Sequence, residues 1–339
     1  MTPALDVGSL VLGIAILYWG AEWLIRGTAG IARALGVTPL IIGLTVVAYG
    51  TAAPELAVAT KTALAGHTPI ALGTVIGSCA ANIALVLGLA ALISPPTIDG
   101  RIIAREIPVL VGSAIAVPIL FRNGVLSRFE GMFLVGCAVV FTLAEITVAA
   151  RLHRDDDAGI PDSQASDAAS AASSSALRAG ALAGGLARPK TSRIMSLIMT
   201  CGGLALLVLG ATLLVDGGRG IAQQLGMSER MLGLTIIALG TALPELIRAV
   251  VAASRGEAAV AVSSVIGANL LSVFLVLGVT AFLEPIRLGE RMHLVDLLGL
   301  VAITLLGVLV MRGSRRITRF EGGLLVLAYI AFLVCAAIL

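Results

Sequence analysis

Charged and aromatic residues are scarce in this sequence. Only 13% of the 339 residues are Asp, Glu, Lys or Arg and 4% are aromatic, whereas 58% are hydrophobic and the mean hydropathy is +1.04. A chain with so little polar surface cannot fold as a water-soluble domain, so the composition predicts a protein that crosses a lipid bilayer several times. The net charge of +3 is small, and the basic residues form short clusters between apolar runs. This pattern offers no footprint for nucleic acid.

Residues for covalent or redox chemistry are also few. The four cysteines lie inside apolar segments and form no CxxC pair, which argues against a disulfide framework and against a metal or redox centre. The three histidines, His67, His153 and His293, fall in expected loops or at span ends, and Ser78-Cys79 has no evident partner. An intramembrane enzyme needs such a constellation, so we expect no enzymatic activity and no cofactor.

Most of the chain consists of an internal sequence repeat with two copies. The segment Gly50–Glu55 reads Gly-Thr-Ala-Ala-Pro-Glu and returns 190 residues later as Gly-Thr-Ala-Leu-Pro-Glu at Gly240–Glu245. The same offset holds without a gap from about residues 20 and 210 to residues 88 and 278. The last apolar run keeps the pattern after one inserted residue, because Arg-Phe-Glu-Gly occurs twice. The repeat therefore covers nearly every apolar segment.

The apolar runs have the length of membrane spans, since a helix needs about 20 residues to cross the hydrocarbon core. They lie near 8–26, 38–64, 70–93, 105–121 and 129–150, and again near 193–215, 228–254, 258–283, 294–311 and 319–338. Each repeat thus holds five spans, and an odd number makes the two copies cross the membrane in opposite senses. We predict an all-α polytopic membrane protein with ten transmembrane helices, as two inverted five-helix repeats with broken helices.

The repeats define the domain boundaries. Residues 1–150 form the first repeat, 151–192 a linker and 193–339 the second repeat. The linker begins with three aspartates and continues as an Ala/Ser/Gly tract, which is too poor in large apolar residues to build a core, so we expect a disordered tether. Most Lys and Arg lie in loops that share one side when the N-terminus is outside. The positive-inside rule then places both termini outside the cell membrane and the linker in the cytoplasm.

Each copy of the repeated segment places a proline directly before a glutamate inside an apolar span. Pro54 and Pro244 cannot donate a hydrogen bond to the carbonyl four residues earlier, so we predict a helix break at each proline. Freed carbonyls and ionisable side chains are tolerated at membrane depth where they line a cavity or bind something. Each break offers a carbonyl, a hydroxyl and a carboxylate, from Gly50, Thr51 and Glu55 in the first repeat and from Gly240, Thr241 and Glu245 in the second.

These groups suit a hard cation such as Ca²⁺ or Na⁺, which prefers oxygen ligands. Inverted symmetry brings both sets together near the membrane midplane. Two carboxylates at one site can hold a divalent ion, or monovalent ions and protons in its place, and exchange requires such mutually exclusive occupancy. The plainer interpretation is that each glutamate is a buried acid paired with a neighbouring base.

The third span of each repeat adds small and polar residues. In membranes such residues let helices approach closely, and packing is the plain interpretation of that composition. We favour the amide of Asn269 as a further ligand, whereas Ser78, Asn82 and Ser272 could either add neutral oxygens or bond only to the backbone. At the start of the fourth span of the second repeat, we expect Asp296 to form a local ion pair with His293.

At these motifs the chain resembles the calcium/cation antiporter superfamily, and most closely the prokaryotic sodium/calcium exchangers. Those proteins are similar in having ten spans in two inverted repeats, each with a Gly-Thr-Ser-x-Pro-Glu motif followed by a Gly-Asn-x-x-Gly-Ser-Asn motif. The resemblance implies that Glu55 and Glu245 ligate calcium and sodium, that Thr51 and Thr241 are the motif threonines, and that Asn269 is the amide of the second motif.

The chain also departs from the family pattern. Ala52 and Ala242 stand where the family usually has serine, and Cys79 stands where the first Gly-Ser-Asn would end, so three oxygen ligands are missing. Arg248 lies one turn after Glu245, within reach of an i,i+3 ion pair, where it could tune the site.

We therefore expect a secondary antiporter that exchanges calcium for sodium by alternating access, in which the first two spans of each half slide or rock against the core. The expected partners are small inorganic cations and the lipid bilayer, and the transported ions are calcium, sodium or protons. We treat the chain as monomeric. A proton-coupled calcium or cation exchanger and a non-transporting scaffold or sensor are the alternatives.

Overall fold

The computed structural model describes residues 3–37, 39–98, 100, 102–157, 192–288, 294–313 and 316–338. These residues are almost entirely helical, and nine of their helices are long and apolar enough to cross a membrane. The first repeat contains α1 (Pro3–Ala34), α2 (Pro39–Ile42), α3 (Ala48–Leu64), α4 (Thr68–Ala80), α5 (Leu87–Ile93), α6 (Ile107–Leu120) and α7 (Arg128–Asp157). The second contains α9 (Arg193–Gln224), α10 (Glu229–Leu232), α11 (Ala238–Ser254), α12 (Ala258–Leu271), α13 (Gly278–Leu283), α14 (Leu294–Gly313) and α15 (Arg319–Ile338).

The order of elements repeats, as the sequence predicts. Helices α2 and α3 together form the second predicted span of the first repeat, as α10 and α11 do in the second. The later helices α4, α5, α6 and α7 have their counterparts in α12, α13, α14 and α15. Two short strands, β1 (Val125–Leu126) and β2 (Ile286–Arg287), pair antiparallel and link the two repeats. The fold is thus the predicted ten-helix inverted repeat.

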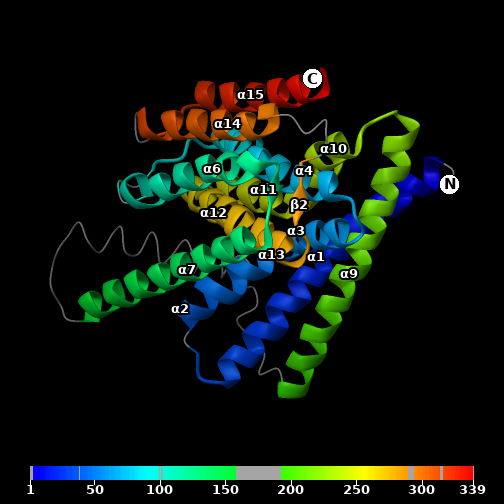
Figure 1. Cartoon of the computed structure of the whole chain (residues 1–339). Helices are drawn as coiled ribbons and strands as arrows, with labels where there is room; N and C mark the ends of the chain where they lie inside the picture. Colours follow the sequence, from blue (N-terminus) through cyan, green and yellow to red (C-terminus); the bar gives the residue numbers. More distant parts are fainter. Residues whose placement is uncertain are drawn as a thin grey trace.

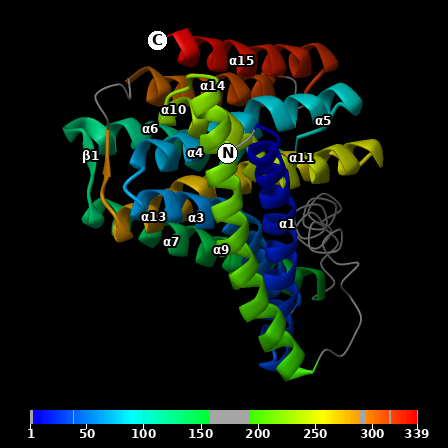
Figure 2. The ribbon, with the colours of Figure 1, turned by 90° about the vertical axis from the view of Figure 1, so that its right-hand side faces the viewer.

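The third span of each repeat forms the centre of the protein. In the most apolar 18-residue stretch of the span Thr68–Ile93, 78% is buried inside the protein, and in that of Ala258–Leu283 67% is buried. The corresponding share is 28% for α1 and 17% for Arg128–Val148. Figure 1 shows α14 and α15 together on one side of this centre and the long α1 and α9 as a slanted pair beside it. In the turned view α1 and α9 pass across the face of the remaining helices (Figure 2). The central helices are therefore shielded from lipid by the others.

Helices α1 and α9 run antiparallel and touch through glycines. A Cβ on Gly20 would lie 2.9 Å from the Leu207 nitrogen and 3.1 Å from the Gly203 carbonyl oxygen. Likewise, a Cβ on Gly210 would lie 3.0 Å from the Gly13 carbonyl oxygen. Gly13 is the repeat counterpart of Gly203, and Gly20 that of Gly210. The crossing is therefore symmetric between the repeats, and only glycine permits this backbone separation.

We expect Gly20→Ala to destabilise the protein by about 1–3 kcal/mol, because the added methyl overpacks the crossing. Thermal unfolding in detergent measures this effect. Gly8 on the same helix has no atom within 4 Å of an added Cβ, so Gly8→Ala should be neutral or stabilising, as alanine favours helix. Equal responses of the two variants would contradict this account of the crossing.

The predicted helix breaks are wrong in position. Pro54 lies inside α3 and Pro244 inside α11, with helix on both sides of each proline. Regular α geometry is lost earlier, in the π-helical segments η1 (Gly43–Val47) and η5 (Gly233–Ile237). A proline removes one backbone hydrogen bond, and a wider turn upstream can absorb its ring without ending the helix. Two further π segments, η2 (Ala81–Val86) and η6 (Ser272–Leu277), interrupt the third spans.

The start of the linker also differs from the prediction. Helix α7 continues to Asp157, so Arg151–Asp157 is helical where a disordered tether is predicted. The sequence has no glycine or proline from Arg151 until Gly159, so no helix-breaking residue ends the last span there. The predicted linker from 158 to 191 lies outside the described residues.

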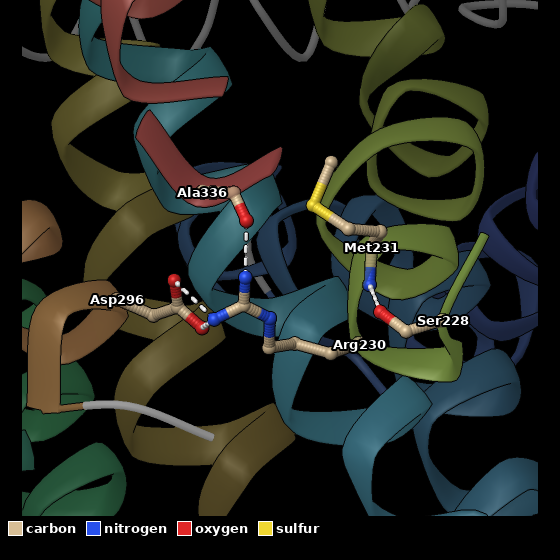
Figure 3. Close-up of polar contacts among 5 residues, drawn as sticks. All are labelled: Ser228, Arg230, Met231, Asp296 and Ala336. Carbon is tan, nitrogen blue, oxygen red and sulfur yellow. Dashed lines mark hydrogen bonds and ion pairs between the residues drawn. The ribbon is translucent and has the colours of Figure 1, made fainter. Parts of the chain in front are cut away.

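A buried ion pair fastens α14 and α15 to the start of α10. Arg230 is 8% exposed and Asp296 is fully buried; the Arg230 Nη1 to Asp296 Oδ2 distance is 3.2 Å. Arg230 also donates to the carbonyl of Ala336 near the end of α15, and the Ser228 hydroxyl caps α10 by accepting from the Met231 amide at 3.3 Å (Figure 3). The predicted pairing of Asp296 with His293 stays a prediction, because His293 lies outside the described residues.

Candidate functional site

Glu55 is the centre of a buried polar cluster. It lies on α3, is 8% exposed, and accepts hydrogen bonds at both carboxylate oxygens. One donor is the hydroxyl of Ser78 on α4, and the other is the hydroxyl of Ser272 in η6, at 2.7 Å from Oε2. One serine comes from each repeat, so the carboxylate lies where the two repeats meet.

Glu245 on α11 has a different environment. Its side chain is 10% exposed, and the Arg248 guanidinium on the next turn lies 3.3 Å from Oε1. Helix α11 also contacts α3, the helix that carries Glu55. The structure thus brings both predicted glutamates to one region and confirms the predicted contact between Glu245 and Arg248.

The two half-sites are not chemically equivalent. By the 190-residue offset, Ser78 corresponds to Ala268, and Ser272 corresponds to Asn82. Neither hydroxyl donor of Glu55 is therefore repeated around Glu245. Conversely, Arg248 corresponds to Val58, which is fully buried. The first half-site is built from neutral donors and the second contains a cation.

The asparagines of the third spans lie where the two repeats contact each other. Asn269 donates from Nδ2 to the carbonyl of Cys79 at 3.2 Å, and these two residues are repeat counterparts, so their contact lies on the pseudo-two-fold axis. The Oδ1 atoms of Asn82 and Asn269 are buried, and neither has a hydrogen-bond partner among the residues that the structure describes. Buried amide oxygens usually have partners, so both are available as cation ligands.

The motif threonines bond to their own helices. Thr51 donates to the Ala48 carbonyl at 2.8 Å, and Thr241 to the carbonyls of Ile237 and Ala238 at 3.2 and 3.1 Å. A hydroxyl that donates in this way still has lone pairs for a cation.

The two glycines of the repeated motif, Gly50 and Gly240, lie beside helices α1 and α9. Gly50 packs on the Ile25 side chain of α1, and Gly240 lies near Ile14 of α1 and Leu214 of α9. The motif glycines of the second spans therefore contact the first span of one or both repeats.

The cluster suits a hard cation better than a transition metal. Within the described ranges, no group of three or more His, Cys, Asp or Glu side chains could hold a metal ion. The available ligands are two carboxylates with hydroxyl and amide oxygens, which Ca²⁺ and Na⁺ accept. Sequence reasoning left Ser78, Ser272 and Asn82 open. The structure distinguishes the two serines by their hydrogen bonds to Glu55, and Asn82 by its buried amide oxygen.

Inverted helical repeats with acidic residues buried between them are the architecture of ion-coupled secondary transporters. The chain belongs to the sodium/calcium exchanger protein family, whose model matches residues 5–147 and 195–337. It is a multi-pass membrane protein of a transporter family rather than of an enzyme family.

Relatives and solved structures agree with this assignment. CaxA of Alkalimonas amylolytica is 32% identical over 95% of this chain and 96% of its own length. The sodium/calcium exchanger MaX1 of Methanosarcina acetivorans is 31% identical over 96% of each chain. A structure of the sodium-calcium exchanger NCX_Mj, soaked with sodium and strontium, matches 98% of this chain and 99% of its own with 28% identity and a TM-score of 0.60.

Proposed function

We propose that this protein exchanges calcium for sodium across the cell membrane at a site formed by Glu55 and Glu245. The observation that carries the proposal is the Glu55 carboxylate, buried and bonded by Ser78 and Ser272 from opposite repeats. An acid at this depth is costly and is usually functional. The exchange activities named for MaX1 and NCX_Mj support the choice of ions.

The proposed ligand set is larger than the two acids. Calcium takes six to eight oxygens, at about 2.3–2.6 Å. The carboxylates lie on α3 and α11, and the amide oxygens of Asn82 and Asn269 and the serine hydroxyls lie on the central third spans. We propose that Thr51, Thr241 and the carbonyls of Gly50 and Gly240 complete the sphere during transport.

We further propose that α1 and α9 move together against the central helices to alternate access. Their glycine crossing makes them one antiparallel unit, and this unit contacts Gly50 and Gly240 beside the site. Cation binding neutralises the carboxylates, which makes the movement less costly than for an empty, charged site. The orientation proposed from the loop charges has both termini outside and the linker inside.

Proton-coupled exchange is the second candidate. It is favoured by Ala52 and Ala242, which are 7% and 5% exposed and provide no hydroxyl where the family pattern has serine. A sodium ion needs several oxygen ligands, whereas a proton needs only a carboxylate. Loss of two hydroxyls therefore weakens a sodium site more than a proton site.

Uptake of ⁴⁵Ca²⁺ into proteoliposomes tests both candidates. With an outward sodium gradient we expect uptake, and Glu245→Gln should reduce it at least about tenfold, because a charged ligand is worth about 1.4 kcal/mol or more. Uptake driven only by an outward proton gradient would select the second candidate. The absence of calcium uptake under either gradient would contradict calcium exchange by both routes, and exchange of other cations or a scaffold or sensor role would remain.

A further inference from the structure

Arg248 places a permanent positive charge inside the candidate cation site. Its Nη1 lies 3.3 Å from Glu245 Oε1, and the glutamate side chain is only 10% exposed. Exposed i,i+3 ion pairs contribute little, but here the acid is buried, and its partner replaces water or a bound cation. A guanidinium stays protonated in proteins, so this charge cannot be switched off.

The same position in the first repeat carries no charge. Val58 is the repeat counterpart of Arg248 and is fully buried, and among the described residues the nearby Glu55 accepts hydrogen bonds from two neutral hydroxyls. The other basic residue on these two helices is Lys61, which lies in the last turn of α3. Arg248 is therefore the cation directed at the carboxylates in this part of the described structure.

The charge of the empty site follows from these contacts. Two ionised carboxylates contribute two negative charges, and Arg248 cancels one of them. A single monovalent cation beside Glu55 then neutralises the cluster, whereas two would be needed if position 248 were neutral. Arg248 therefore occupies, beside Glu245, the electrostatic place that a bound monovalent cation would otherwise fill.

We propose that Arg248 is a built-in counter-ion that takes the place of one monovalent cation at Glu245. The exchanger then moves one sodium ion fewer per calcium ion than the same site would without the arginine. This inference deepens the proposed function and rests on its assignment of Glu55 and Glu245 as cation ligands.

The test compares Arg248→Val, which installs the residue found at the repeat counterpart, with Arg248→Lys, which keeps the charge. The sodium-to-calcium ratio is measured in proteoliposomes from the sodium gradient that just balances a fixed calcium gradient. We expect Arg248→Val to raise the ratio by about one and Arg248→Lys to keep the wild-type value. Arg255→Gln is the control, because Arg255 is an exposed residue at the end of the same helix. A wild-type ratio in Arg248→Val would overturn the inference.

A second readout keeps the inference testable if the wild type transports no calcium. The slope of Tm against the logarithm of sodium concentration reports how many sodium ions bind to the folded protein. We expect this slope to increase by about one ion in Arg248→Val and to stay unchanged in Arg248→Lys. Equal slopes in wild type and Arg248→Val, including slopes of zero, would refute the proposal that Arg248 takes the place of a bound monovalent cation. Absence of calcium flux with a changed slope would refute only the proposed exchange of calcium.

Discussion

Glu55→Gln should lower calcium uptake at least about 100-fold, which corresponds to about 2.7 kcal/mol. The substitution removes a negative charge and replaces one acceptor oxygen by an NH₂ donor. Ser78 and Ser272 both donate to this carboxylate, so one of them would then face a donor. The amide therefore loses a hydrogen bond as well as a ligand for the cation. Initial rates of ⁴⁵Ca²⁺ uptake under an outward sodium gradient measure the loss.

Glu22→Gln is the matched control. Glu22 lies on α1 and pairs with Arg26 at 2.8 Å, and the Arg26 side chain is 45% exposed, so this surface pair contributes little. Its removal should leave uptake near the wild-type rate. Substantial uptake by Glu55→Gln would mean that this carboxylate serves packing and that the transport site lies elsewhere.

Arg230→Met should destabilise the protein by about 3–5 kcal/mol, because it removes the guanidinium that lies 3.2 Å from the buried carboxylate of Asp296. It also removes the bond to the Ala336 carbonyl, which ties α15 to α10. Chemical or thermal unfolding in detergent provides the free energy. We expect the substitution to lower the free energy of unfolding. Transport should decrease only in proportion to the amount of folded protein that is lost.

The double variant Arg230→Met with Asp296→Leu separates the ion pair from simple loss of packing. Replacing both charges by apolar side chains of similar volume removes the uncompensated charge, so most of the stability should return. Arg26→Met serves as the surface comparison and should cost about 0–1 kcal/mol. A double variant as unstable as the single one would show that the charge itself contributes little.

The repeat, the ten spans and the two glutamates could be predicted from sequence because each depends on a strong local constraint. Bilayer thickness fixes the length of apolar runs, and an acid inside such a run is rare unless it has a role. The contact of Arg248 with Glu245 was also predictable, since residues three apart share one face of a helix.

The donors to Glu55 depend on long-range geometry instead. Ser272 lies 217 residues from Glu55 and comes from the other repeat, at a position whose counterpart in the first repeat is an asparagine. No local rule selects it from the other small polar residues of the spans. The pair of Arg230 and Asp296, 66 residues apart, is equally hidden in sequence. Local reasoning also misplaced the helix interruptions, because the neighbouring turns share the distortion that a proline introduces.

The contact of Cys79 with Asn269 has a consequence for how such a protein can diversify. In a homodimer of one five-helix unit, a residue on the two-fold axis faces its own copy, so any substitution appears on both sides at once. Joining the units in one chain removes that restriction. Here an amide donor on one side meets a backbone acceptor on the other, and Cys79 is free to differ from Asn269. Gene fusion thus allows each half of the ion pathway to acquire its own charge and its own ligands.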